Sequence, residues 1–159
     1  MKNLKIWSLA LALLVALTGC GKEEASDAVP FNPIATDQLV QKIESVWQLV
    51  EYAGQPAQFD VYVDFKAGSF ELYQRMYSYE YEKLAGTYTL EGNTLTGEYS
   101  NGAEWNNTYT VSIAENPVRL RLTEENGTYA EYVVVEEVPA HIKGQAVEAK
   151  STRASEYFL

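Results

Sequence analysis

Residues 86–100 of the chain read GTYTLEGNTLTGEYS, and this stretch decides the fold class. On each side of Gly92-Asn93, polar and apolar side chains alternate, so each flank has one polar and one apolar face. Alternation with a period of two is typical of half-buried β-strands. A pair of turn-forming residues between two such flanks predicts a hairpin. The stretch therefore predicts two neighbouring antiparallel strands.

The same alternation extends over residues 45–138. It predicts eight strands, near residues 47–49, 59–65, 70–73, 87–90, 94–99, 108–113, 118–122 and 129–135. The connections are short, and such connections allow only antiparallel neighbours, because a parallel crossover needs about a dozen residues. A meander of this kind removes its exposed edges by closing into a barrel. The predicted fold is therefore all-β, an eight-stranded antiparallel up-and-down barrel with a short N-terminal helix over residues 36–46, where apolar residues recur at helical spacing.

The first twenty residues have the pattern of an exported lipoprotein. Lys2 and Lys5 flank an apolar run over residues 6–17, which is shorter than the roughly 20 residues of a membrane-spanning helix. The run ends in Leu17-Thr18-Gly19-Cys20, which resembles the bacterial lipobox, whose thiol accepts diacylglycerol. Cys20 is the only cysteine, so an internal disulfide is excluded. We predict a signal peptide at residues 1–19, a lipid anchor at Cys20 and a tether over residues 20–36.

The net charge of the chain and the residues after Cys20 indicate which partners and which cellular location to expect. The net charge is −10, and removal of residues 1–19 takes away two lysines and no acidic residue. Such an acidic chain repels phosphate backbones, which argues against nucleic acid as a partner. The expected membrane link is therefore covalent, through diacylglyceryl-Cys20. Gly21 instead of Asp favours the outer membrane, and Lys22-Glu23-Glu24 is similar to a short surface-export tag of Bacteroidota, with a solvated tether as the alternative.

Four segments resemble the lipocalin-like domain lipoproteins of Bacteroidota, within the wider calycin barrels. They are residues 45–50, 64–73 and 86–100, and the pair Val138-Pro139. One departure is Ser45, which stands where the family usually has a glycine before the tryptophan of its first strand. The resemblance covers about residues 37–159 and implies a barrel that holds a small apolar ligand, and not an enzyme. We expect a lipocalin-like barrel domain at residues 37–139 and a C-terminal tail at residues 140–159.

The inward-facing positions of the predicted strands supply the candidate ligand site. An eight-stranded barrel is just wide enough to be filled by side chains or to hold one small ligand. Gly86 and Gly97 fall at inward positions and favour a cavity, as do inward tyrosines, whose hydroxyls need partners when buried. A packed lumen is the alternative. The expected ligand is small and hydrophobic or amphipathic, and the residues predicted to line its site are Trp47, Phe65, Tyr88, Tyr99, Tyr109 and Tyr132.

A second function is suggested by Tyr77, Tyr79 and Tyr81, which share the parity opposite to Phe70 and Leu72. If the third strand ran straight through them, they would form an exposed aromatic surface for a protein or a glycan. If a turn fell near Tyr77, the parity would reverse and they would join the core. The alternative function is thus a packed-barrel accessory or interaction protein.

No catalytic, metal or cofactor site is predicted. His141 is the only histidine and lies beyond the barrel, so neither a Cys–His pair nor a plausible Ser–His–Asp set exists. Asp60 and Asp64 lie on a polar strand face, where solubilising charges are more common than paired glycosidase acids. We therefore expect a non-catalytic binding protein. The chain ends in Tyr157-Phe158-Leu159, an apolar tripeptide expected to dock either on the barrel or on a partner.

Overall fold

The computed structural model describes residues 31, 36–149 and 157–159, so the predicted signal peptide, Cys20 and most of the tether lie outside the described residues. Its elements in chain order are α1 (Thr36–Ile43), β1 (Val46–Tyr52), β2 (Gln55–Pro56), β3 (Asp60–Lys66), β4 (Ser69–Arg75), β5 (Glu82–Glu91), β6 (Thr94–Tyr99), β7 (Tyr109–Glu115), β8 (Val118–Glu124), β9 (Tyr129–Val135), α2 (Ala140–Gln145) and β10 (Val147–Glu148). No helix among these residues is both long enough and apolar enough to cross a bilayer.

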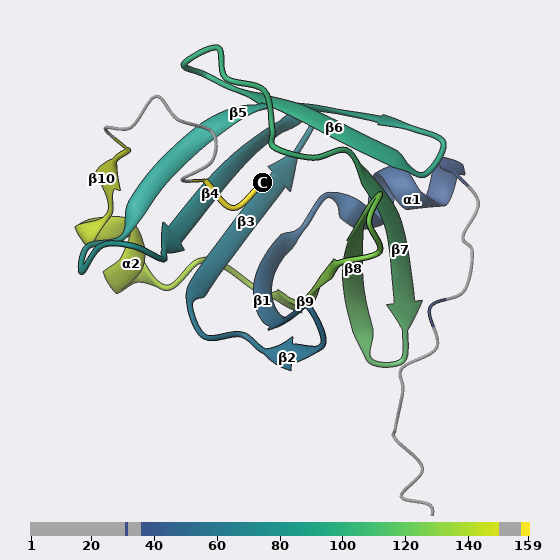
Figure 1. The fold of residues 1–159 in the computed structure, drawn as a ribbon, viewed down its shortest axis with the longest axis horizontal. Helices are drawn as coiled ribbons and strands as arrows, with labels where there is room; N and C mark the ends of the chain where they lie inside the picture. Colours follow the sequence, from purple (N-terminus) through teal and green to yellow (C-terminus); the bar gives the residue numbers. More distant parts are fainter. Residues whose placement is uncertain (1–30, 32–35, 150–156) are drawn as a thin grey trace, which may run out of the picture.

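Eight of the ten strands close into a ring in the order β1, β3, β4, β5, β6, β7, β8, β9 and back to β1 (Figure 1). Every neighbouring pair in this ring is antiparallel. The predicted all-β, up-and-down barrel with a short N-terminal helix is confirmed. The helix ends at Ile43, earlier than predicted, because β1 begins at Val46. The short strand β2 pairs with β1, and β10 adds in parallel to β5.

Of the neighbouring strands in the ring, β6 and β7 have the fewest paired residues. Strands β5 and β6 pair along their whole shared length, from Glu91↔Thr94 to Gly86↔Tyr99. In contrast, β6 and β7 share only the pairs Thr94↔Thr110 and Leu95↔Tyr109. The chain between Tyr99 and Tyr109 forms no further strand, although residues 103–105 stay bonded to β6 through Tyr99 N–H to the carbonyl of Ala103 and Trp105 N–H to the carbonyl of Gly97. The indole of Trp105 then fills the space inside, within ring contact of Phe65, Phe70 and Tyr109.

The two inward glycines leave no empty space. A Cβ atom on Gly86 would lie 2.0 Å from the carbonyl oxygen of Glu98, and one on Gly97 would lie 2.3 Å from the Trp105 ring. These glycines therefore allow a neighbouring strand and an indole to approach closely. The expectation that they open a cavity is wrong.

Helix α1 closes one end of the barrel. Leu39 and Ile43 are buried against the lumen, and the indole N–H of Trp47 donates to the carbonyl of Ile43 over 2.9 Å. At its rim, the ammonium of Lys42 pairs with Glu115 of the β7–β8 hairpin. This end is thus covered by apolar packing rather than by a loop alone.

A second, smaller core lies outside the barrel wall. Helix α2 and the segment before it cover the outer face of β3 and β4, in a cluster of Tyr62, Tyr73, Tyr81, Val138 and Ile142. Residues 140–148 have little periodicity in sequence, yet they form a helix and an added strand because this tyrosine-rich face needs a cover.

The glycine contacts predict opposite effects of two Gly→Ala substitutions. Gly86→Ala should lower the free energy of unfolding by about 3 kcal/mol, because its new methyl group meets backbone. Gly144→Ala in α2 meets nothing within 4 Å and should raise it by up to about 1 kcal/mol. Urea denaturation of both variants measures this difference. Equal stability of Gly86→Ala and the parent chain would contradict the close approach of β5 and β6.

Candidate functional site

The end of the barrel opposite α1 is lined by aromatic side chains, and we call it the aromatic mouth. It consists of Tyr52, Phe59, Tyr99, Tyr109 and Tyr132. Tyr52 and Tyr99 are the last residues of β1 and β6, and Tyr109 is the first residue of β7. In an antiparallel ring these strand ends meet at the same edge, which brings residues distant in sequence together.

A bulge turns Tyr52 into the mouth. The pairing of β1 with β9 shifts register between Leu49 and Glu51. A bulge inserts one extra residue and reverses the facing of the residues that follow. Tyr52 consequently packs on the same side as Leu49, with its ring 5.9 Å from that of Phe59.

Tyrosine hydroxyls converge inside the mouth. Tyr132 is fully buried, and its hydroxyl has no hydrogen-bond partner among the described residues. Burial, with the neighbouring Tyr109, Tyr99 and Tyr52, holds the pKa of Tyr132 well above its ordinary value. Burial also raises the pKa of Tyr109 to about 12 and that of Tyr99 further. An unpartnered buried hydroxyl costs roughly 1–3 kcal/mol, so Tyr132 marks a place where a polar ligand atom would be stabilised.

Residues 157–159, which we call the tail segment, lie inside this mouth, and Figure 1 shows the C-terminus within the ring of strands. The Phe158 ring lies 5.6 Å from the rings of both Tyr52 and Phe59. The Tyr157 ring lies 4.7 Å from that of Tyr99. Leu159 is fully buried. Of the two expectations for the apolar tripeptide, docking on the barrel is the one that the structure shows.

Hydrogen bonds fix the backbone of the tail segment. The hydroxyl of Tyr99 donates to the backbone oxygen of Leu159 over 2.7 Å. The Asn106 side-chain amide donates to the carbonyl of Tyr157 over 3.1 Å. In the opposite sense, the N–H of Phe158 donates to Oε1 of the buried Gln74 over 2.9 Å. The mouth therefore offers both donors and acceptors for amide groups.

Two arginines near this end of the barrel are already paired with carboxylates. Arg75, at the end of β4, pairs with Asp60 and lies over the Tyr81 ring. Arg121 pairs with Glu131 on the outer wall between β8 and β9. Among the described residues, no ion pair reaches into the mouth, so its polarity comes from neutral hydroxyl and amide groups.

The predicted ligand-lining residues separate into two groups. Tyr99, Tyr109 and Tyr132 belong to the aromatic mouth. Trp47 and Phe65 are buried nearer α1, and Tyr88 is partly exposed with its ring 5.0 Å from that of Phe65. A ligand-sized void would leave its lining side chains accessible to water. The fully buried Trp47, Phe65 and Tyr132 therefore show a lumen filled by the protein's own atoms.

The predicted surface tyrosines also separate. Tyr77 and Tyr79 are 76% and 102% exposed, as an interaction surface requires. Tyr81 is only 8% exposed, so its assignment to that surface is wrong. The physical reason is that α2 and the segment before it cover the outer face of the barrel on which Tyr81 lies together with Tyr73.

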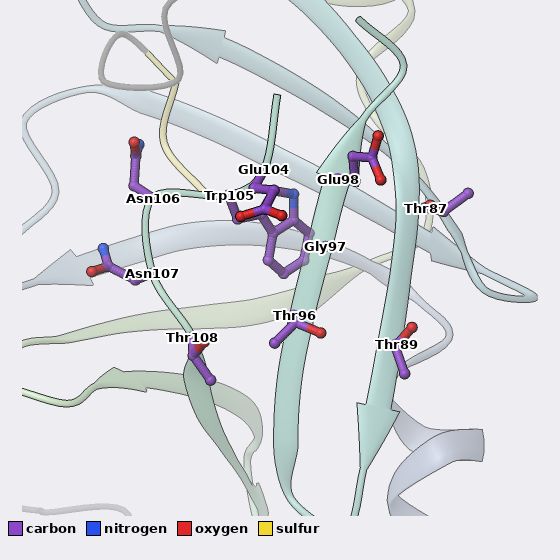
Figure 2. A pocket seen from close by; sticks show the side chains of 10 residues that line it. All are labelled: Thr87, Thr89, Thr96, Gly97, Glu98, Glu104, Trp105, Asn106, Asn107 and Thr108. Carbon is purple, nitrogen blue, oxygen red and sulfur yellow. The ribbon is translucent and has the colours of Figure 1, made fainter. Parts of the chain in front are cut away.

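A polar groove of about 420 Å³ lies on the outside of the barrel, where the 104–108 segment diverges from β6. Figure 2 shows threonine, asparagine and glutamate side chains around it, with the indole of Trp105 against Gly97. Trp105 is buried and separates this groove from the lumen. The groove is therefore a feature of the outer wall, and its mainly polar lining suits a hydrophobic ligand poorly.

A second hollow, of about 370 Å³, lies at the α1 end. Its lining includes Trp47, Ile113, Val118 and Val134, of which Val134 is 42% exposed. This α1-end groove is mainly apolar and lacks the convergent hydroxyls of the mouth. It is a rival location for a hydrophobic ligand, and variants can distinguish the two ends.

The pKa shifts in the mouth predict alkaline instability. The folded-state pKa of Tyr109 is raised to about 12 from an unfolded value of 10.0, so the unfolded chain loses its proton first as the pH rises. The contribution of Tyr109 to the free energy of unfolding is fully present below pH 10 and is lost between pH 10 and 12. At ~1.4 kcal/mol per pKa unit, the loss is up to about 3 kcal/mol. Urea midpoints at pH 8, 9.5, 11 and 12 measure it. Tyr109→Phe should flatten the fall, and a midpoint constant up to pH 12 would contradict it.

Comparison with known proteins agrees with this architecture. A family model described as a lipocalin-like domain matches residues 43–120, which run from the end of α1 through β7 into β8. No curated protein and no solved structure is similar enough to the chain to count as a match. The segment over residues 43–120 is therefore similar to the lipocalin-like domains, and the ring of strands that continues through β9 is the barrel expected for one.

Proposed function

We propose that the chain is a non-catalytic binding protein whose lipocalin-like barrel takes a small amphipathic molecule at the aromatic mouth. The observation that carries this proposal is the fully buried Tyr132 hydroxyl without a partner, surrounded by three other tyrosines. A concave apolar site with a few convergent polar groups is the usual form of a ligand site. The similarity to lipocalin-like domains supports the same conclusion.

The ligand is expected to be neutral. Burying a charged group is costly unless an opposite charge accompanies it. The cations near this end, Arg75 and Arg121, are engaged by Asp60 and Glu131 outside the barrel. Hydroxyl, carbonyl or amide groups therefore match the mouth better than a phosphate.

The proposal includes the cell envelope as location. The lipobox-like end of the apolar run supports a diacylglyceryl anchor at Cys20, on a signal peptide over residues 1–19. Gly21 and the Lys22-Glu23-Glu24 tag support the outer membrane and exposure at the cell surface, as in the lipocalin-like lipoproteins of Bacteroidota that the chain resembles. The tether and the barrel at residues 37–139 would then stand away from the lipid.

The alternative function, a protein- or glycan-binding accessory role, is favoured by one observation. Tyr77 and Tyr79 are exposed on the turn between β4 and β5, at the same end of the barrel as the mouth. Tyr77 is near enough to Tyr52 to raise its pKa, after the larger effect of burial. A partner on these tyrosines would sit at the rim of the mouth.

Tyr132→Phe should affect stability and binding in opposite directions. Removal of an unpartnered buried hydroxyl should raise the free energy of unfolding by about 1 kcal/mol or more. It should also weaken binding of a ligand that bonds to this hydroxyl, about fivefold to tenfold. Fluorescence titration with a set of neutral amphiphiles measures affinity, starting with N-phenyl-1-naphthylamine as a reporter and long-chain alcohols and amides as competitors.

Two controls locate the site. Val134→Ser changes only the α1-end groove and should leave affinity unaltered, as should Tyr79→Ala on the exposed turn. If Val134→Ser weakens binding and Tyr132→Phe does not, the ligand lies at the other end. The sulfonated analogue 8-anilinonaphthalene-1-sulfonate should bind more weakly than the neutral probe, and tighter binding of the sulfonate would contradict a neutral site.

The anchor has its own test. The full chain expressed in a Gram-negative host should incorporate labelled palmitate and fractionate with outer membranes, because two or more acyl chains hold a protein stably on a bilayer. Cys20→Ser should abolish labelling and release the protein from membranes. Persistent membrane association of Cys20→Ser would show that the membrane link does not depend on Cys20.

A further inference from the structure

The tail segment is held in the mouth as a bound ligand would be. Within three consecutive residues, the backbone oxygens of Tyr157 and Leu159 accept hydrogen bonds from Asn106 and Tyr99. The N–H of Phe158 donates to Gln74, whose side chain is fully buried in the wall of β4. A buried side-chain amide that takes a backbone N–H is a specific recognition contact, since burying it without a partner would be costly.

The side chains of the tail segment fill the apolar part of the same site. The Phe158 ring makes contacts with Tyr52 and Phe59 and lies 6.4 Å from the Tyr132 ring. Aromatic pairs at such separations add to the free energy of burial. The tail segment therefore combines amide groups with an aromatic body, and the mouth is complementary to both.

The fit is incomplete in one respect. With the tail segment in place, the hydroxyl of Tyr132 still has no partner among the described residues. A molecule of the same chemistry that also carries a group reaching Tyr132 would satisfy one more buried polar atom than the tail segment does. Such a molecule can compete with a segment that is permanently tethered nearby.

We propose that the aromatic mouth is a receptor site for amide-bearing aromatic molecules, and that the chain's own residues 157–159 occupy it until such a ligand displaces them. This proposal rests on the proposed function, because it names the ligand chemistry and the occupant of the same site. The ligand binds only when the tail segment is out of the mouth. Its apparent affinity is therefore its intrinsic affinity multiplied by the fraction of molecules in which the mouth is open.

The test compares the full chain with its Phe158→Ser variant, in which the aromatic anchor of the tail segment is lost. N-phenyl-1-naphthylamine should bind the variant at least about tenfold more tightly than the parent chain. N-acetyl-Tyr-Phe-Leu-amide, which reproduces the tail segment, should displace the probe from the variant. N-acetyl-Tyr-Ser-Leu-amide, the matched peptide without the phenylalanine ring, should not displace it.

The outcomes separate this proposal from the proposed function. Equal or weaker probe binding by Phe158→Ser would overturn displacement and leave a ligand site at the mouth intact. Tighter probe binding without displacement by the peptide would overturn the amide chemistry. No binding of the probe or of either peptide to either protein would overturn both proposals, because an opened mouth that takes no ligand is not a receptor site.

A second variant avoids the apolar contacts. Asn106 is an exposed residue, so Asn106→Ala removes the two side-chain hydrogen bonds to Tyr157 and Leu159 without opening the core. Like Phe158→Ser, it should make the probe bind more tightly, here by about threefold. Tyr79→Ser, which removes a fully exposed aromatic ring, is the matched control and should leave the affinity unchanged. Unchanged affinity in Asn106→Ala as well as Phe158→Ser would overturn the displacement.

Discussion

Closure of the ring at β6 and β7 is the constraint on which the rest of the structure depends. These strands share two register pairs, and backbone hydrogen bonds between residues 103–105 and Gly97 and Tyr99 of β6 extend the seam. Trp105 completes the closure by lying on Gly97 and packing against aromatic rings of the opposite wall. Its indole fills the lumen beside Phe65, Phe70 and Tyr109, and the tail segment fills the mouth.

Alternation in sequence predicted the strands well, because each residue of a barrel wall faces either water or the lumen. It failed where the period of two is interrupted. The bulge in β1 turns Tyr52 inward, and no distinctive residue type in the sequence announces it. Tyr81 is a different case, because it keeps the outward side that alternation predicts and is buried there by α2. Parity arguments therefore identified Tyr99, Tyr109 and Tyr132 but missed Tyr52.

The contents of the lumen were less predictable than its walls. An inward glycine can mean a void or a close neighbour, and only the position of Glu98 and Trp105 decides between them. The tail segment is a similar case. Its apolar composition predicted docking, but its target is set by Gln74 and Asn106, polar residues that lie far from it in sequence and have no pattern in common.

The chemistry of the mouth explains why a filled barrel can still be a binding site. Side chains of the strands cannot leave the lumen without unfolding the sheet, whereas residues 157–159 enter as backbone held by three side chains. A filled site of this kind avoids exposing aromatic surface to water when no ligand is present. The unpartnered Tyr132 hydroxyl lowers the free energy of unfolding, and a phenylalanine at this position would avoid that loss in a core with a purely structural role. Its presence beside residues 157–159 is the physical basis of the proposal that the mouth is a receptor site.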